Sequence, residues 1–194
     1  YRFGGDSGLA GHSLGNLILA ALSDLHQGFQ AGLDAATSLL GLHGRVVPVS
    51  LQGDLVLMGE TAAGERLVGE SAVGNAPHRI VRLWLEPRDA EVNPEAVKSI
   101  QGADLIVLGP GSLYTSVLPN LLVEGLREAL ASSRAPTVYV CNVATEWRET
   151  DGYGVEEHFK VFQAHSGVSV SHVLVNSKVW DLPEEWNQVS VPSV

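Results

Sequence analysis

The chain has 194 residues, of which 45% are hydrophobic and 18% are charged, a composition typical of a soluble globular protein that is long enough to bury a core. Its net charge of −10 and its scattered Lys and Arg residues argue against a nucleic-acid-binding protein. We expect no membrane span, because no uninterrupted apolar run approaches the roughly 20 residues that one needs. The single cysteine, Cys141, excludes a disulfide within the chain and predicts a reducing, cytoplasmic environment. Because the sequence begins at Tyr1 without a methionine, we expect the natural protein to start upstream.

Residues 13–41 predict two helices. Apolar residues recur at helical spacing from Leu14 to Leu25, and Ser13 is a suitable N-cap for this helix. A second set of apolar residues begins at Phe29 and predicts a helix that closes at Gly41.

A β-rich excursion follows at about residues 46–75, where short β-prone runs are separated by glycines. This pattern predicts antiparallel hairpins rather than part of a parallel core. Residues 78–87 alternate apolar and basic side chains and predict a further strand, and residues 94–102 predict a short helix or turn.

The second half of the chain alternates strands and helices. Three short apolar runs predict core strands, and the two segments between them have helical spacing. Strand–helix–strand order predicts right-handed crossovers and a parallel sheet covered by helices on both faces. We therefore expect one α/β domain over residues 1–194. The expected strands are at 104–109, 137–143 and 171–177, with helices at 116–133 and 155–167.

The stretch GPGSLYTSVLPN, residues 109–120, lies at the carboxyl end of the first core strand, the edge at which ligands bind in open α/β sheets. Gly109 and Gly111 allow the main chain to approach a ligand closely. Thr115 or Ser116 could cap the following helix, whose free N–H groups would suit a phosphate. The loop has neither Walker nor Rossmann glycine spacing. Taken alone, it fits a phosphate cradle and an ordinary turn about equally.

The stretch GLAGHSLGNL, residues 8–17, contains a second glycine-rich helix start. GHSLG matches the G-x-S-x-G pattern of a nucleophile elbow, so Ser13 is a candidate hydrolase nucleophile. That motif needs a preceding strand, which the upstream residues do not predict. We favour a helix N-terminus that lines the same cleft as the first loop, with Ser13 and Asn16 at the ligand. An exposed, capped helix start is the alternative.

The third stretch, CNVATEWRETDGYG at residues 141–154, follows the second core strand. It places Asn142, Thr145, Asp151 and Tyr153 at the carboxyl edge of the sheet. Asp151 could accept a hydrogen bond from a ribose hydroxyl or help to hold a metal, and Tyr153 could stack on a base or sugar. An ordinary loop with Asp151 as a helix cap is the alternative. The Cys141 thiol is expected to be buried and inert.

The same three stretches, in this order, resemble the YvcK/CofD-like family over roughly residues 1–176. The form GPGSLYTS…PN is similar to its gluconeogenesis-factor branch; the other branch contains the 2-phospho-L-lactate transferases. The resemblance implies a Rossmann-like parallel sheet flanked by helices, and a cytoplasmic protein used for gluconeogenic growth and cell-shape control. It also implies binding of a nucleotide sugar of the UDP-N-acetylglucosamine type. The family's opening GGGTG-like loop and Asp-Asp-Gly-Gly segment are missing, and EWR at 146–148 departs from its Gln-Pro-Gly-like turn.

Three functions remain open from the sequence. The first is a regulator that binds a UDP-sugar or another nucleotide. The second is a Mg²⁺-dependent transferase of the 2-phospho-L-lactate type, which needs mainly positioning and charge neutralisation. The third, a serine hydrolase at Ser13, has only a short pattern behind it.

The expected ligand-binding residues come from all three stretches, and no residue is assigned a catalytic role. The histidines show no metal-ligand spacing, so no zinc site is expected, whereas a Mg²⁺ bound together with the nucleotide stays open. A homo-oligomer also stays open. The candidate ligand-binding set is Ser13, Asn16, Gly109, Gly111, Ser112, Tyr114, Thr115, Ser116, Asn142, Thr145, Asp151 and Tyr153.

Overall fold

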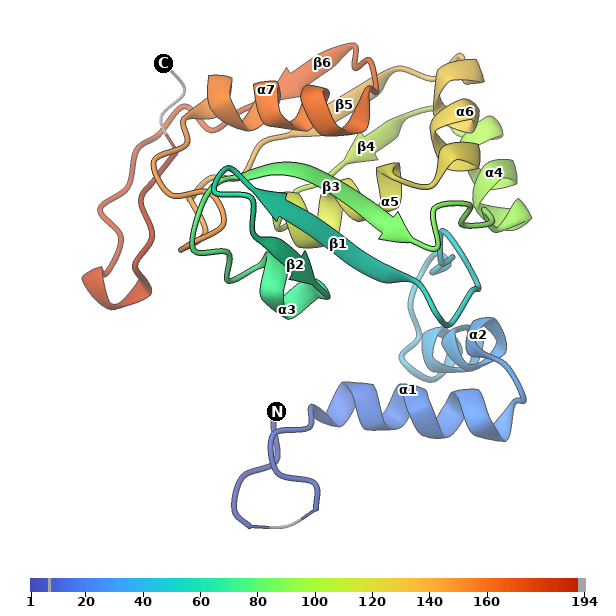
Figure 1. Cartoon of the computed structure of the whole chain (residues 1–194). Helices are drawn as coiled ribbons and strands as arrows, with labels where there is room; N and C mark the ends of the chain where they lie inside the picture. The colour runs from blue at the N-terminus through green and yellow to red at the C-terminus, as the bar shows by residue number, and fades with distance from the viewer. Residues whose placement is uncertain (7, 192–194) are drawn as a thin grey trace. The chain divides into compact units, whose positions relative to one another are not determined.

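A computed structural model describes residues 1–6 and 8–191 of the chain (Figure 1). The chain contains two compact units, Tyr1–Leu51 and Gln52–Val194, and each is described by itself. That all 194 residues form one domain stays a prediction. No helix in the described part of the chain is both long enough and apolar enough to cross a membrane.

The first unit is a pair of helices, as the apolar spacing predicts. Helix α1 spans Leu14–Leu25, and its N-cap Ser13 accepts a hydrogen bond at Oγ from the amide of Asn16 at 3.2 Å. Helix α2 spans Phe29–Leu39. The two helices meet closely at Gly32, where an added Cβ atom would lie 2.5 Å from the Ser23 hydroxyl. The glycine is therefore needed for the close helix contact.

The predicted hairpins form an antiparallel sheet with the strand order β2-β1-β3. Strand β1 (Val56–Thr61) pairs with β2 (Arg66–Val68) and with β3 (Ile80–Glu86). Within the expected excursion of about 46–75 strand pairing starts at residue 56, and β3 is the further strand that was expected at residues 78–87. Within these bounds the short helix α3 (Glu70–Val73) replaces a strand.

The three core strands form the predicted parallel sheet, in the order β4-β5-β6. In its register, Leu108 lies beside Tyr139, which lies beside Val173. Helix α4 precedes β4, three helical pieces connect β4 to β5, and α7 connects β5 to β6 (Figure 1). The bounds are α4 Pro94–Gln101, β4 Ile106–Leu108, a π-helix Leu113–Val117, α5 Leu118–Leu121, α6 Glu124–Ser132, β5 Thr137–Val140, α7 Val155–Ser166, β6 His172–Leu174 and a 3₁₀ turn Glu184–Trp186.

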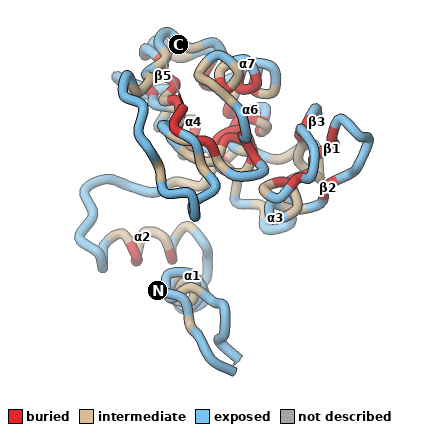
Figure 2. The backbone as a smooth tube through the Cα atoms, turned by 90° about the vertical axis from the view of Figure 1, so that its left-hand side faces the viewer, coloured by how far each residue is buried: buried red, intermediate tan, exposed pale blue. Residues whose placement is uncertain are grey.

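Helices cover one face of the parallel sheet. On that face the ring of Tyr139 stacks on Phe162 of α7, with centroids 4.4 Å apart. On the other face Val107 is 52% exposed and Leu174 is 59% exposed. This face is therefore partly exposed within the unit, and helices on both faces stay a prediction. Figure 2 shows one group of buried residues on β5 and the segments packed with it and another on β1, β2 and β3, whereas α1 has none.

Candidate functional site

The GPGS loop follows β4 and requires glycine at its first position. Gly109 has a φ of +82°, and an added Cβ atom would lie 3.0 Å from the carbonyl oxygen of Val140. The loop is also tied to the end of the neighbouring strand. Asn142 accepts a hydrogen bond from the Gly111 amide at 3.2 Å and donates one to its carbonyl at 3.0 Å. The two loops that were expected to form the site therefore lie side by side.

Two carboxylates from the loop after β5 hold the residues that follow Gly111. The Ser112 hydroxyl donates to Glu146 Oε1 at 2.6 Å. Glu149 accepts from the Tyr114 amide at 2.6 Å and from the Thr115 hydroxyl at 3.5 Å. In this structure the hydroxyls of Ser112 and Thr115 therefore have carboxylate partners within the chain.

The expected helix cap at Thr115 or Ser116 is wrong. The helical segment begins at Leu113 as a π-helix, and Thr115 and Ser116 lie inside it. An amide of its first turn, that of Tyr114, is satisfied by the side chain of Glu149, which is 35 positions away in the sequence. A long-range carboxylate thus does the work of a local cap. Pro119 falls in the first turn of α5.

Glu149 is a buried carboxyl, with 8% of its surface exposed. Burial is the main cause that raises its pKa from the ordinary 4.5 to about 7. The hydrogen bond from Tyr114 opposes this rise, and the nearby Glu146 carboxylate adds to it. Glu149 therefore titrates close to neutral pH in the folded chain.

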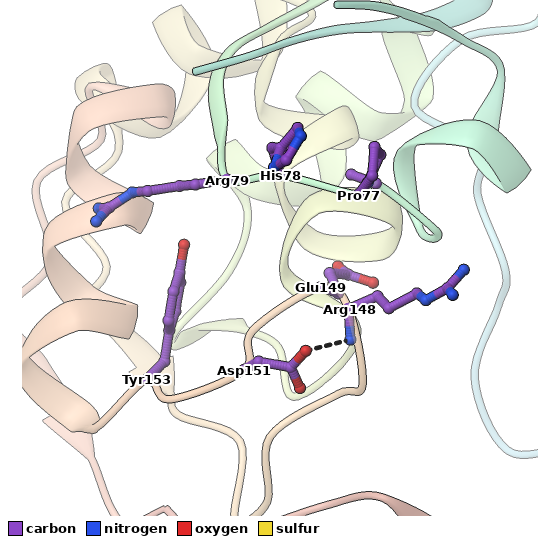
Figure 3. Close-up of a pocket in the computed structure, with 8 residues that line it drawn as sticks. Pro77, His78, Arg79, Arg148, Glu149, Asp151 and Tyr153 are labelled. Atoms are coloured by element: carbon purple, nitrogen blue, oxygen red, sulfur yellow. Dashed lines mark hydrogen bonds between the residues drawn. The ribbon is translucent and has the colours of Figure 1, made fainter. Parts of the chain in front are cut away.

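A pocket of about 540 Å³ lies between the segment before β3 and the loop after β5. We call it the Tyr153 pocket. Figure 3 shows Pro77 and His78 on one side of it, facing Glu149, Arg148 and Asp151, with Arg79 and Tyr153 at one end. It is lined by Ala76, Pro77, His78, Arg79, Arg148, Glu149, Asp151 and Tyr153.

Tyr153 is fixed by several aromatic and polar neighbours. Its hydroxyl lies 3.0 Å from that of the fully buried Tyr114. Its ring meets the imidazole of His158 edge-on, with centroids 5.4 Å apart. The Arg79 guanidinium lies over the Tyr153 ring at 5.8 Å and is paired with Glu157. This end of the pocket therefore presents a preorganised aromatic ring beside a neutralised cation.

The predicted residues differ in where the structure places them. Asp151 and Tyr153 line the Tyr153 pocket. Thr145 is buried, and its hydroxyl accepts from the Val189 amide at 2.9 Å, a partner within the chain. Ser116 is exposed on the helical segment. Because Asn16 and Ser13 belong to the first unit, their place in the same cleft stays a prediction.

Ser13 has the environment of a helix cap. Its hydroxyl accepts a hydrogen bond from the Asn16 amide, and residues 8–11 before it form turns. A nucleophile elbow needs a strand directly before the serine. The local structure therefore gives the hydrolase hypothesis no support.

Sequence reasoning missed five polar or charged residues at or beside the site, besides Ala76 and Pro77. His78 and Arg79 precede a strand in the antiparallel sheet, and no local signal links them to a loop some 70 positions later. Glu146 and Glu149 were visible only as acidic loop residues. The missed set is His78, Arg79, Glu146, Arg148 and Glu149. Within the described residues, no group of three or more His, Cys, Asp or Glu side chains is arranged to hold a metal ion.

Comparisons with known proteins agree with this architecture. Residues 1–190 match the family model described as 2-phospho-L-lactate transferase CofD. The gluconeogenesis factor of Halalkalibacterium halodurans is 43% identical over 179 residues, which are 92% of this chain and 55% of that protein. The chain belongs to the CofD/UPF0052 family.

Other relatives in the CofD/UPF0052 family give the same result. The gluconeogenesis factor of Bacillus subtilis is 40% identical over 186 residues, which are 95% of this chain and 58% of that protein. A crystal structure of a UPF0052 family member from Bacillus halodurans has a TM-score of 0.88 and 39% identity, and covers 99% of this chain and 63% of that one. The mixed α/β fold expected from the resemblance is confirmed. The chain spans little more than half the length of the gluconeogenesis factors that it matches.

Proposed function

We propose that this chain binds a nucleotide sugar of the UDP-N-acetylglucosamine type in the Tyr153 pocket. The observation that carries the proposal is the placing of Asp151 and Tyr153, from the loop after β5, opposite His78 and Arg79. A tyrosine ring suits stacking on a base or sugar, and a carboxylate suits a ribose or sugar hydroxyl. Arginine side chains supply the charge that a diphosphate needs.

The GPGS loop is connected to the Tyr153 pocket through Glu149. Glu149 lines the Tyr153 pocket and also binds the loop at Tyr114, so the two segments are mechanically coupled. A ligand that contacts Glu149 would therefore change the restraint on the start of the helical segment. Through Glu149, a bound nucleotide sugar would therefore affect the conformation of the GPGS loop and of the helical segment that follows it.

Regulation follows as the biological role in this proposal. The named relatives are gluconeogenesis factors, which supports a role in carbon metabolism. Control of cell shape is the further part of the proposal and rests on the family resemblance alone. Both roles would be exerted in the cytoplasm by the nucleotide-sugar-bound protein.

A transferase is the second candidate, because the matching family model is described as a 2-phospho-L-lactate transferase. In that case a nucleotide-activated donor would occupy the same pocket and an acceptor alcohol would receive the group. The two candidates differ in nucleotide preference and in turnover.

The proposal is tested by isothermal calorimetry with UDP-N-acetylglucosamine on the 194-residue chain and three variants. Tyr153→Leu removes the ring and is expected to weaken binding about 5- to 150-fold, since stacking on a base is worth about 1–3 kcal/mol. Tyr153→Phe keeps the ring and is expected to retain most of the affinity. Trp186→Leu, an exposed aromatic that does not line the pocket, is the control.

Melting temperatures of the same variants separate binding from folding, because Tyr153 also contacts the Tyr114 hydroxyl. A folded Tyr153→Leu variant with wild-type affinity would refute this pocket as the binding site. A wild-type chain that binds no UDP-N-acetylglucosamine would refute the proposed ligand.

A further inference from the structure

Arg148 adopts a backbone conformation that side chains rarely take. Its φ is +68°, in the left-handed region where glycine is favoured. The conformation is held by two hydrogen bonds, from the Arg148 amide to Asp151 Oδ2 at 2.8 Å and from the Thr150 amide to the Glu146 carbonyl at 2.8 Å. Strained residues of this kind persist at sites where the side chain has a use. Gln27 and Asn187 also have positive φ, so the conformation alone does not assign a role to Arg148, and its place in the Tyr153 pocket is the second observation.

The Arg148 guanidinium is available to a ligand. It is exposed and lies 4.4 Å from the ring centroid of Trp147, which is itself 52% exposed. In the part of the chain that the structure describes, no carboxylate forms an ion pair with it, whereas Arg79 is paired with Glu157. Arg148 thus supplies the uncompensated guanidinium of the Tyr153 pocket.

The direction of the side chain fits this use. Figure 3 shows Arg148 extending away from Asp151 and Tyr153, so that its guanidinium and the Tyr153 ring lie toward different ends of the pocket. The Asp151 carboxylate is bonded to the Arg148 amide and not to its guanidinium. A ligand that reaches from the Tyr153 ring to Arg148 would need an aromatic or sugar part at one end and an anionic part at the other.

We propose that Arg148 is a ligand-binding residue whose guanidinium takes a phosphate of the nucleotide sugar, at the end of the pocket away from Tyr153. Its planar fork can bind two phosphate oxygens at once, and the Trp147 ring holds the fork in place. This inference rests on the proposed function for the rest of the ligand. The phosphate contact itself depends only on the guanidinium.

The test uses two probes, UDP-N-acetylglucosamine and inorganic pyrophosphate, titrated into the wild type, Arg148→Gly and Arg148→Lys. Arg148→Gly is expected to lose at least tenfold in affinity for both probes, while its melting temperature stays equal or rises because the backbone strain is relieved. Arg148→Lys keeps the charge without the planar guanidinium, so its affinity for each probe is expected to lie between those of the wild type and Arg148→Gly. Arg134→Gly, which removes an exposed arginine outside the pocket, is the matched control for net charge.

The outcomes separate this inference from the proposed function. If the wild type binds pyrophosphate but not UDP-N-acetylglucosamine, and Arg148→Gly loses pyrophosphate, the phosphate site stands and the nucleotide-sugar proposal fails. If a folded Arg148→Gly variant binds both probes as the wild type does, the inference is overturned. Absence of pyrophosphate and UDP-N-acetylglucosamine binding in the wild type overturns it as well.

Discussion

Replacing Glu149 with glutamine should stabilise the chain strongly at pH 8 and much less at pH 5. The side chain is buried between the GPGS loop and the Tyr153 pocket, and its pKa of about 7 means that ionisation there is unfavourable. Glutamine has nearly the same shape. Its oxygen can accept the Tyr114 amide, and its NH₂ group can donate to the Thr115 hydroxyl. The substitution therefore removes the charge and keeps the packing.

The sign and size follow from proton linkage. The Glu149 pKa is about 7 in the folded chain and 4.5 ordinarily, so between these values the folded state binds more protons than the unfolded one. The free energy of unfolding contributed by this group falls as the pH rises through that window and is constant above it. From pH 5 to pH 8 the loss is about 2.5 kcal/mol, because the slope approaches about 1.4 kcal/mol per pH unit only near pH 6 and decreases toward pH 5 and pH 8.

Urea denaturation at pH 5, 6, 7 and 8 measures the effect as the difference between Glu149→Gln and the wild type. That difference should grow by about 2 to 3 kcal/mol across the series. Glu128→Gln, at an exposed carboxylate on α6, is the matched control and should show a flat difference. Parallel stability curves for Glu149→Gln and the wild type would refute the reasoning.

Three further predictions concern the residues around the site. Gly109→Ala should lower the free energy of unfolding by about 1–3 kcal/mol and Tm by several degrees, because Gly109 has a positive φ and lies against the Val140 carbonyl. Gly53→Ala, in open space, is the control, and equal Tm values for the two variants would contradict this prediction. Asn142→Leu breaks both hydrogen bonds to Gly111 and should cost about 1–3 kcal/mol in urea denaturation; an unchanged midpoint would argue against this clamp. Burial raises the pKa of Cys141 to about 11, so its thiol should resist Ellman's reagent at pH 8 until the chain unfolds, and fast labelling of the native chain would disprove this.

Local periodicity predicted the elements well. Helix α1 has the bounds Leu14–Leu25 and the N-cap Ser13 that were expected. Both were predictable because apolar spacing and capping depend only on residues near each other in the sequence. The parallel pairing of β4, β5 and β6 followed from strand–helix alternation. Asp151 and Tyr153 reached the pocket because they follow the carboxyl end of a core strand, where such sheets bind ligands.

Contacts between residues far apart in the chain could not be predicted from local sequence patterns. The loop sequence suggested Thr115 or Ser116 as the helix cap, but the group that accepts the Tyr114 amide is Glu149, which only the fold brings near. The positive φ of Arg148 also has no local signal, since arginine disfavours that conformation. The exposed face at Val107 shows a similar limit, because an apolar strand pattern predicts burial without saying what covers it.

The most direct measurement is calorimetric titration of the chain with UDP-N-acetylglucosamine and with GDP, each with and without Mg²⁺, followed by analysis of the recovered ligand. We expect the chain to bind the UDP-sugar in preference to GDP, and the nucleotide sugar to be recovered intact. Preferential, Mg²⁺-dependent binding of GDP would contradict the account and favour the transferase.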